Sequence, residues 1–158
     1  MDPIELIKSD HRKVEALFEE YEAFGDDAYE QKGDIVAAII AELEAHTEME
    51  ETIAYPVFRA ALDDEGDKKV DEAYAEHDVA KHLMEELKSL DPQDVQFAAK
   101  VTVLKENITH HVGEEEEDLL PSAEEVVSGE ERARIGEEMQ AFKDAREDAV
   151  LDEAEDAL

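Results

Sequence analysis

The chain has 158 residues, with 47 acidic against 15 basic side chains and a formal net charge of −32. A charge of this sign opposes binding to nucleic acids and anionic membrane surfaces, which are themselves polyanions. The chain has no cysteine, which excludes disulfides, thiolate chemistry and iron–sulfur clusters. The length fits one domain with a core. The acidity fits a solvated surface adapted to high salt, although a particular partner would also explain it.

Apolar residues recur at steps of three and four, which predicts an all-α chain. We expect helices over about 3–24, from near Asp34 to beyond Pro56, and over about 68–89, 93–121 and 129–152. Pro56 should kink or locally break the second helix, whose apolar stripe continues through Ile53 and Val57. The whole of 1–158 is predicted to be a single domain. It forms an up-down-up-down four-helix bundle over about 3–121, with an additional helix over about 129–152 that packs on the outside.

A repeated register dominates the sequence. Glu50 follows His46 by four residues, Glu115 follows His111 by four, and a proline follows each histidine by ten. His11 and His77 precede these two histidines by 35 and 34 residues, on the apolar stripes of the first and third helices. The chain therefore resembles two helical hairpins of similar design, related by an approximate two-fold axis.

The repeat places polar side chains at core positions of all four bundle helices. Burying unpartnered carboxylates is costly, so these residues need a common reason to face one interior. A dinuclear metal site supplies one, with two imidazoles on each ion and both glutamates bridging the two ions. Imidazole with carboxylate suits iron, and also zinc or manganese. The candidate ligands are His11, His46, Glu50, His77, His111 and Glu115.

Other interpretations stay open at this point. A glutamate four residues after a histidine is common by chance in so acidic a chain, and a metal-free helical interaction protein would also fit. Pairing His110 with Glu115 is a rival register, although His110 and His82 fall off the stripes and favour the surface. Glu51 and Glu116 are either hydrogen-bond partners of the ligands or solvated acids. Tyr21 and Tyr74 are expected in the core, with an approach to the site as the alternative.

The joint pattern resembles the hemerythrin-like family, also called the HHE cation-binding domain. The matching pieces are Asp10–Arg12 with Leu17–Phe18, His46–Glu51 with Tyr55–Pro56, Glu76–His77 with 83–87, and His110–Glu116 with Leu120–Pro121. The resemblance covers roughly residues 1–122. It implies a four-helix bundle with a non-haem site of two iron ions, oxo- or hydroxo-bridged, held by the six candidate ligands. Zinc or manganese is less expected.

One position departs from the oxygen-carrying members that the sequence resembles. They have a further histidine four residues after that of the third helix, where this chain has Lys81. A solvent molecule, a carboxylate or an open position would take its place. Lys81 itself is expected at the surface, its stem on apolar neighbours, with a place near the metals as the alternative.

Two functions follow from such a site. The first is a protein that binds or senses dioxygen, nitric oxide or peroxide at the metals. The second is an oxidoreductase with peroxidase- or catalase-like activity. The N-terminus carries no targeting signal and no apolar stretch approaches eighteen residues, so we expect a soluble cytoplasmic protein with neither nucleic-acid nor membrane partners.

Overall fold

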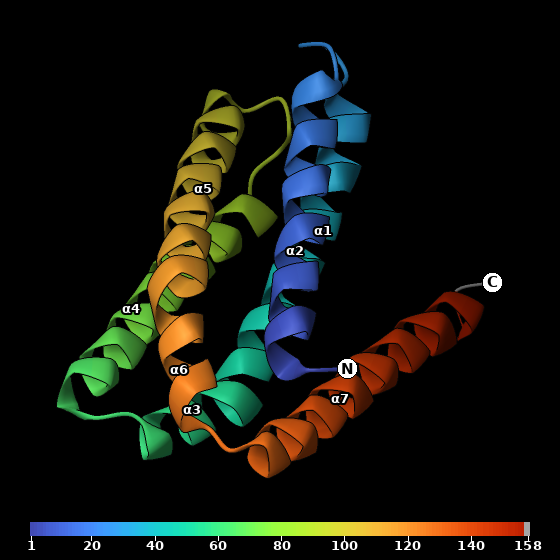
Figure 1. The fold of residues 1–158 in the computed structure, drawn as a ribbon. Coiled ribbons are helices and arrows are strands. Elements are labelled where there is room, and N and C mark those ends of the chain that lie inside the picture. Colours follow the sequence, from blue (N-terminus) through green and yellow to red (C-terminus); the bar gives the residue numbers. More distant parts are fainter. Residues whose placement is uncertain (157–158) are drawn as a thin grey trace.

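Helices account for nearly all of the chain in the computed structural model, which describes the backbone of residues 1–156 and the side chains of residues 1–149. Four long helices form the bundle and a fifth crosses one of its ends (Figure 1). The elements are α1 (Pro3–Ala23), α2 (Tyr29–Met49), η1 (Glu50–Ala54), α3 (Tyr55–Ala61), α4 (Asp64–Lys88), α5 (Val95–Glu114), η2 (Glu115–Leu119), α6 (Leu120–Val126) and α7 (Gly129–Asp156). The predicted all-α class and bundle architecture are confirmed.

Aspartates begin three of the bundle helices. The side chains of Asp2, Asp63 and Asp94 accept hydrogen bonds from backbone N–H groups in the first turns of α1, α4 and α5. These N–H groups have no partner within the helix, so an acidic cap satisfies them and complements the helix dipole. The helix expected over about 68–89 therefore begins at Asp64, four residues earlier than expected. The second begins at Tyr29, five residues earlier than expected.

A π-helical turn precedes each of the two repeated prolines. The backbone N–H of Tyr55 donates to the carbonyl of Glu50, and that of Leu120 donates to the carbonyl of Glu115. The wider turn accommodates the missing N–H of Pro56 without ending the helix. The predicted local break is therefore a π-helical insertion.

The first π-turn changes which residues face the core. Ile53 and Val57, expected on the apolar stripe, are only partly buried, whereas Tyr55 and Phe58 are buried. The wider turn shifts the helical phase by about one residue, so the stripe moves to new positions. Ile53 and Val57 therefore pack against the edge of the core and not in its centre.

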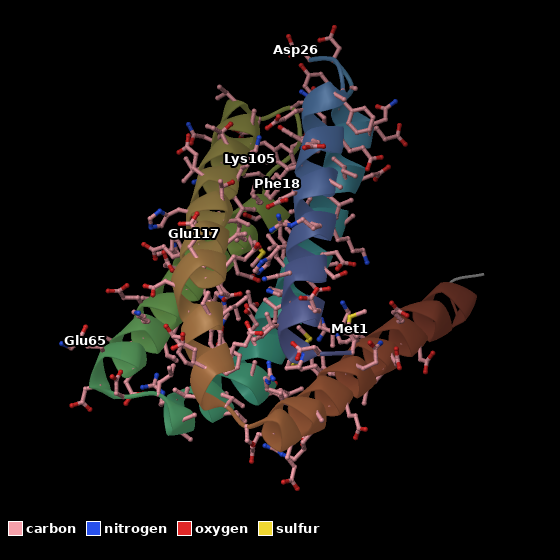
Figure 2. All side chains as sticks on the ribbon, viewed as in Figure 1. Met1, Phe18, Asp26, Glu65, Lys105 and Glu117 are labelled. Carbon is pink, nitrogen blue, oxygen red and sulfur yellow. The ribbon has the colours of Figure 1, made fainter. Side chains whose placement is uncertain are left out.

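Two apolar clusters fill the interior and leave the polar residues between them. One cluster lies toward the end where α3, α6 and α7 meet, around Ile7, Tyr55 and Leu120. The other lies toward the opposite end, around Phe18, Leu43 and Leu104. Figure 2 shows Phe18 between the two hairpins and Asp26 at the tip of the first, far from α7.

The fifth helix is part of the core as well as an outer layer. It contacts α1, α2 and η1, and Ile135 and Met139 on it are fully buried among residues of the first cluster. Gly136 lies against the backbone of Met1, where a larger side chain would clash. The expectation that this helix packs on the outside therefore needs correction. Its weak apolar stripe is buried against one end of the bundle. Within the described residues, no helix is long and apolar enough to cross a membrane.

Candidate metal centre

Six polar side chains converge in the middle of the bundle, and they are the six expected from the sequence. His11 comes from α1, His46 from α2, His77 from α4 and His111 from α5. Glu50 begins η1 and Glu115 begins η2, so each carboxylate lies one turn beyond the histidine of its own helix. All six are buried, with exposures between 0 and 6%.

The carboxylates join the histidines into two interlocked clusters. Glu50 Oε1 lies 3.0 Å from His46 Nε2 and 3.3 Å from His77 Nε2. Glu115 lies 3.1 Å from His11 Nε2 through Oε1 and 3.2 Å from His111 Nε2 through Oε2. One potential cation site contains His11 and His46, the other contains His77 and His111, and both contain Glu50 and Glu115.

Each imidazole is held on its outer side by a carboxylate from another helix. A carboxylate only accepts hydrogen bonds, so every Nδ1 must carry the proton and donate it. The arrangement fixes both ring orientation and tautomer, as is usual for histidines that bind metals. The four pairs are His11 with Glu116 (2.7 Å), His46 with Asp10 (2.9 Å), His77 with Glu51 (2.8 Å) and His111 with Glu76 (2.9 Å).

With Nδ1 protonated, a neutral imidazole presents only a lone pair at Nε2. The Nε2 atoms of His77 and His111 face each other at 3.1 Å, an arrangement that requires a proton or a cation between them. Both oxygens of Glu50, Glu115 Oε1 and the Nε2 atoms of His11 and His46 are buried without a hydrogen-bond partner. The interior of the site thus holds more hydrogen-bond acceptors than donors. Bound cations would satisfy the excess acceptors.

The pKa values of two of the histidines also fit cations at the clusters. Burial lowers the pKa of His46, but the charge of Glu50 and the hydrogen bond to Asp10 outweigh it and raise the pKa to about 10. Burial also lowers the pKa of His111, but hydrogen bonds to Glu115 and Glu76 raise it to about 11. The cluster therefore takes up protons to balance its carboxylates where no metal does so.

A second ring of charge surrounds the carboxylates that hold the imidazoles. Lys143 of α7 pairs with Asp10, Arg12 with Glu116, and Lys81 donates to Glu51 at 2.9 Å. Burial raises the pKa of Asp10, but His46 and Lys143 together bring it below its usual value. Burial raises that of Glu51 as well, and Lys81 and His77 likewise lower it.

The open alternatives at several residues can now be decided. Glu51 and Glu116 hold imidazoles and are not simply solvated acids. Lys81 is 44% exposed and contacts the site only through Glu51. His82 and His110 are exposed as expected, and His110 faces Glu76 and Glu114, so the rival pairing of His110 with Glu115 is wrong.

Tyr55 is the site residue that sequence reasoning missed. Its hydroxyl donates to Glu115 Oε2 and lies 3.4 Å from His77 Nε2, and its ring stacks on that of His77. Burial and the charge of Glu115 raise the pKa of this fully buried phenol well above 10, so it stays protonated. Only the phase shift at the π-turn turns Tyr55 inward, which the stripe pattern did not reveal. Tyr74, one of the two tyrosines considered, contacts the ring of Tyr55 edge-on, with the ring centroids 5.4 Å apart.

Two small cavities adjoin the clusters. One of about 20 Å³ lies against the imidazoles and is otherwise lined mainly by aliphatic residues such as Val14, Leu43 and Ile108. The other, of about 90 Å³, lies between α4 and the α5–η2 segment and has a charged lining.

Comparisons with known proteins agree with this geometry. The model of a family described as the hemerythrin HHE cation binding domain matches residues 2–123. The chain is 30% identical over 139 residues to a DNA nickase of a Nostoc species, covering 88% of this chain but only 38% of that protein. It is 25% identical over 139 residues to an uncharacterized hemerythrin-like protein of Schizosaccharomyces pombe, covering 88% and 68% respectively. The crystal structure of a hemerythrin HHE cation-binding domain-containing protein from Mycobacterium kansasii has the same fold, with a TM-score of 0.79, 23% identity and coverage of 96% and 91%.

Proposed function

The chain belongs to the hemerythrin HHE cation-binding domain family, and we propose from that premise that its two clusters hold a pair of iron ions. The pair would bind or sense a small ligand such as dioxygen, nitric oxide or peroxide. His11 and His46 would hold one ion, His77 and His111 the other, and Glu50 and Glu115 would contact both.

The observation that carries this proposal is the sharing of both carboxylates between the clusters. A single ion would leave two imidazole Nε2 atoms and part of each carboxylate buried without partners, at a cost of several kcal/mol. Two divalent ions would more than offset the charge of the two glutamates and would use all four lone pairs. Imidazole and carboxylate together favour iron over magnesium or calcium, with zinc and manganese as less expected occupants.

Iron would supply a redox-active Lewis acid with coordination positions left open for a small molecule. The protein's own part is to limit what reaches it. The aliphatic side chains of Val14, Leu43 and Ile108 exclude water around the 20 Å³ cavity beside the imidazoles. The four outer carboxylates fix the rings, so the ligand set cannot rearrange easily.

Lys81 stands where oxygen-carrying relatives have another histidine, and this bears on the kind of ligand chemistry. It is engaged with Glu51 and offers nothing to the clusters directly. The two ions would therefore have the same number of protein ligands. Such a balanced site fits sensing or turnover at least as well as reversible oxygen transport.

An oxidoreductase with peroxidase- or catalase-like activity is the second candidate, and Tyr55 favours it. The phenol is protonated, fully buried and hydrogen-bonded to a shared carboxylate. It could give its proton to a group bound beside Glu115, and a proton from solvent would then restore the phenol, because the ionised Glu115 has none to return.

The nickase likeness leads to no nucleic-acid proposal. The chain spans 38% of that relative, and its net charge of −32 opposes the DNA backbone. We propose that nucleic acid is not a partner of this domain.

The decisive experiment is elemental analysis of natively purified protein together with its visible absorption spectrum. Two iron ions per chain with charge-transfer absorption would support the proposal, and peroxide turnover against stoichiometric ligand binding would then separate the two candidates. Zinc alone would end both redox candidates. A metal-free protein whose stability does not respond to added iron would overturn the metal site itself.

A further inference from the structure

The 90 Å³ cavity connects the surface with the metal centre. Its inner end is formed by His111 and Glu115, both at most 5% exposed. Toward solvent it is lined by Glu72, Glu114 and Asp118, all of them exposed. We refer to this cavity, between α4 and the α5–η2 segment, as the acidic slot.

The approximate two-fold symmetry gives the slot a counterpart on the other hairpin. The counterparts of Glu72, Glu114 and Asp118 are Leu6, Met49 and Ile53, by the same offsets that relate the histidines. Leu6 and Met49 are buried in the cluster that includes Ile135 and Met139 of α7, and Ile53 packs against it. One face of the metal centre is thus sealed by apolar packing, whereas the equivalent face is an open, negatively charged cavity.

The slot ends on a group that needs a cation. Glu115 is 1% exposed, and its Oε1 faces the Nε2 lone pair of His11 at 3.1 Å without a hydrogen-bond donor. Glu76 and Glu114 line the slot, and with His110 beside it they place ligand atoms within 4.8 Å of one another, close enough to hold an ion in transit. Lys69 pairs with Asp118 at 2.6 Å across the slot, and this pair can part because both side chains are substantially exposed.

We propose that the acidic slot is the uptake route for divalent metal ions into the dinuclear site. An ion is captured between Glu76, His110 and Glu114, where carboxylates replace part of its hydration shell, and then passes to Glu115 and His111. The same charges repel anions, so the slot selects for cations. This inference rests on the proposed dinuclear centre, but it concerns the rate of loading and not the final occupancy.

The test is the rate of Fe²⁺ uptake by metal-free protein under anaerobic conditions, with free iron removed by chelating resin at successive times. The slot variant combines Glu72→Gln, Glu114→Gln and Asp118→Asn. A control variant combines Glu19→Gln, Asp26→Asn and Glu30→Gln, which removes the same charge from exposed positions at the far end of the bundle.

We expect the slot variant to load about tenfold more slowly than the wild type, and the control variant to load at nearly the wild-type rate. The wild-type rate should also fall more steeply with salt than that of the slot variant. Equal rates in the slot variant and the wild type, or equal slowing in both variants, would overturn the route. If no variant and no wild-type sample reaches two ions at equilibrium, the dinuclear centre itself fails, and the two failures are thereby distinguished.

A second variant tests the route by volume instead of charge. Ala73 lines the slot, and its counterpart on the sealed hairpin is Ile7. Ala73→Ile should slow loading while leaving the slot's charge unchanged, with circular dichroism checking that the helices remain intact. Unchanged loading in a folded Ala73→Ile protein would contradict passage through the slot.

Discussion

The two hairpins present nearly the same ligands to the centre but surround them differently. In the α1–α2 half, Asp10 behind His46 is covered by α7 and paired with Lys143. In the α4–α5 half, Glu76 behind His111 faces an open slot and the exposed His110. The internal repeat therefore fixes the six clustered side chains, whereas the elements packed around each hairpin decide solvent access and charge around each cluster.

Tyr55 adds a second difference between the halves. It follows His46 by nine residues, and the residue at the same distance from His111 is Leu120. Both are fully buried beside a π-turn, but only Tyr55 brings a hydrogen-bond donor, which it gives to Glu115. The two shared carboxylates are thus chemically distinct although their positions in the repeat are equivalent.

The largest effect should come from a residue that belongs to both halves. Glu50→Ala removes a ligand from each proposed ion at once and leaves both sets of imidazoles under-coordinated, so we expect loss of both metal ions after dialysis. His77→Ala removes a ligand of one cluster only and should leave about one ion per chain. Metal analysis of the two variants in parallel provides the test.

A larger metal loss in His77→Ala than in Glu50→Ala would contradict this assignment of shared and unshared residues. If Glu50→Ala retains an ion while His77→Ala loses both, the carboxylate is not shared in the way that its distances to His46 and His77 suggest. His82→Ala serves as the control, because His82 is 79% exposed and pairs only with Glu86.

The four buried histidines of the clusters could be predicted to face one interior because they lie on strongly periodic helices in duplicate register. Among the partners of their Nδ1 atoms, Glu51 and Glu116 were predicted only as one of two alternatives, and Asp10 and Glu76 were not predicted at all. Asp10 is adjacent to His11 in sequence but holds His46, and Glu76 is adjacent to His77 but holds His111. These pairings cross between helices, and they depend on how each hairpin closes.

Other misses have local causes. The sequence indicates a disturbance near Pro56 but not its form, and a kink, a break and a π-turn place Tyr55 in different directions. The weak apolar stripe of α7 did not reveal that Ile135 and Met139 complete the core. Helix periodicity identifies the apolar face of a helix but not the elements that pack against that face. The α7 contact with Asp10 depends on this same packing.

Protonation should stabilise both halves of the metal-free protein, since His46 in one half and His111 in the other have pKa values raised to about 10 and about 11. In the unfolded chain both titrate near 6.5. The folded, metal-free protein therefore binds more protons than the unfolded one above about pH 6.5. Its free energy of unfolding should fall as the pH rises through that window toward 10.

The affinity for metal ions should change with pH in the opposite direction to this stability. The ions displace these two protons, so the apparent affinity should rise with pH, by up to about tenfold per pH unit for each proton released. Chelator competition at pH 7 and pH 9 measures the affinity, and denaturant unfolding of the metal-free protein measures the stability. An affinity that is independent of pH would contradict the placement of the ions at the Nε2 atoms.

Removing the Tyr55 hydroxyl should make the two halves more alike. Tyr55→Phe leaves Glu115 Oε2 without its phenol donor, and a hydrogen bond to a charged group contributes about 1.5–3 kcal/mol to the free energy of unfolding. Tyr74→Phe is the matched control, because its partly buried hydroxyl donates only to the backbone carbonyl of Glu51 at 3.2 Å. Denaturant unfolding of both variants gives the comparison. A loss in Tyr55→Phe no larger than that in Tyr74→Phe would show that the phenol is not specially coupled to Glu115.

The smallest effect should come from the lysines behind the outer carboxylates. Lys143→Met removes the α7 cation from Asp10, which is 7% exposed, whereas Lys81→Met removes a 44% exposed cation from Glu51, which is 18% exposed. The more buried pair is less screened by water and salt, so the free energy of unfolding of the metal-free protein should fall by about 1 kcal/mol for Lys143→Met and by less for Lys81→Met. Lys143→Arg should restore most of the loss. Arginine keeps the positive charge beside Asp10, although its side chain packs differently. Denaturant unfolding of the metal-free variants at low and high salt measures these differences, and equal losses in both methionine variants would mean that cover by α7 does not distinguish the two halves electrostatically.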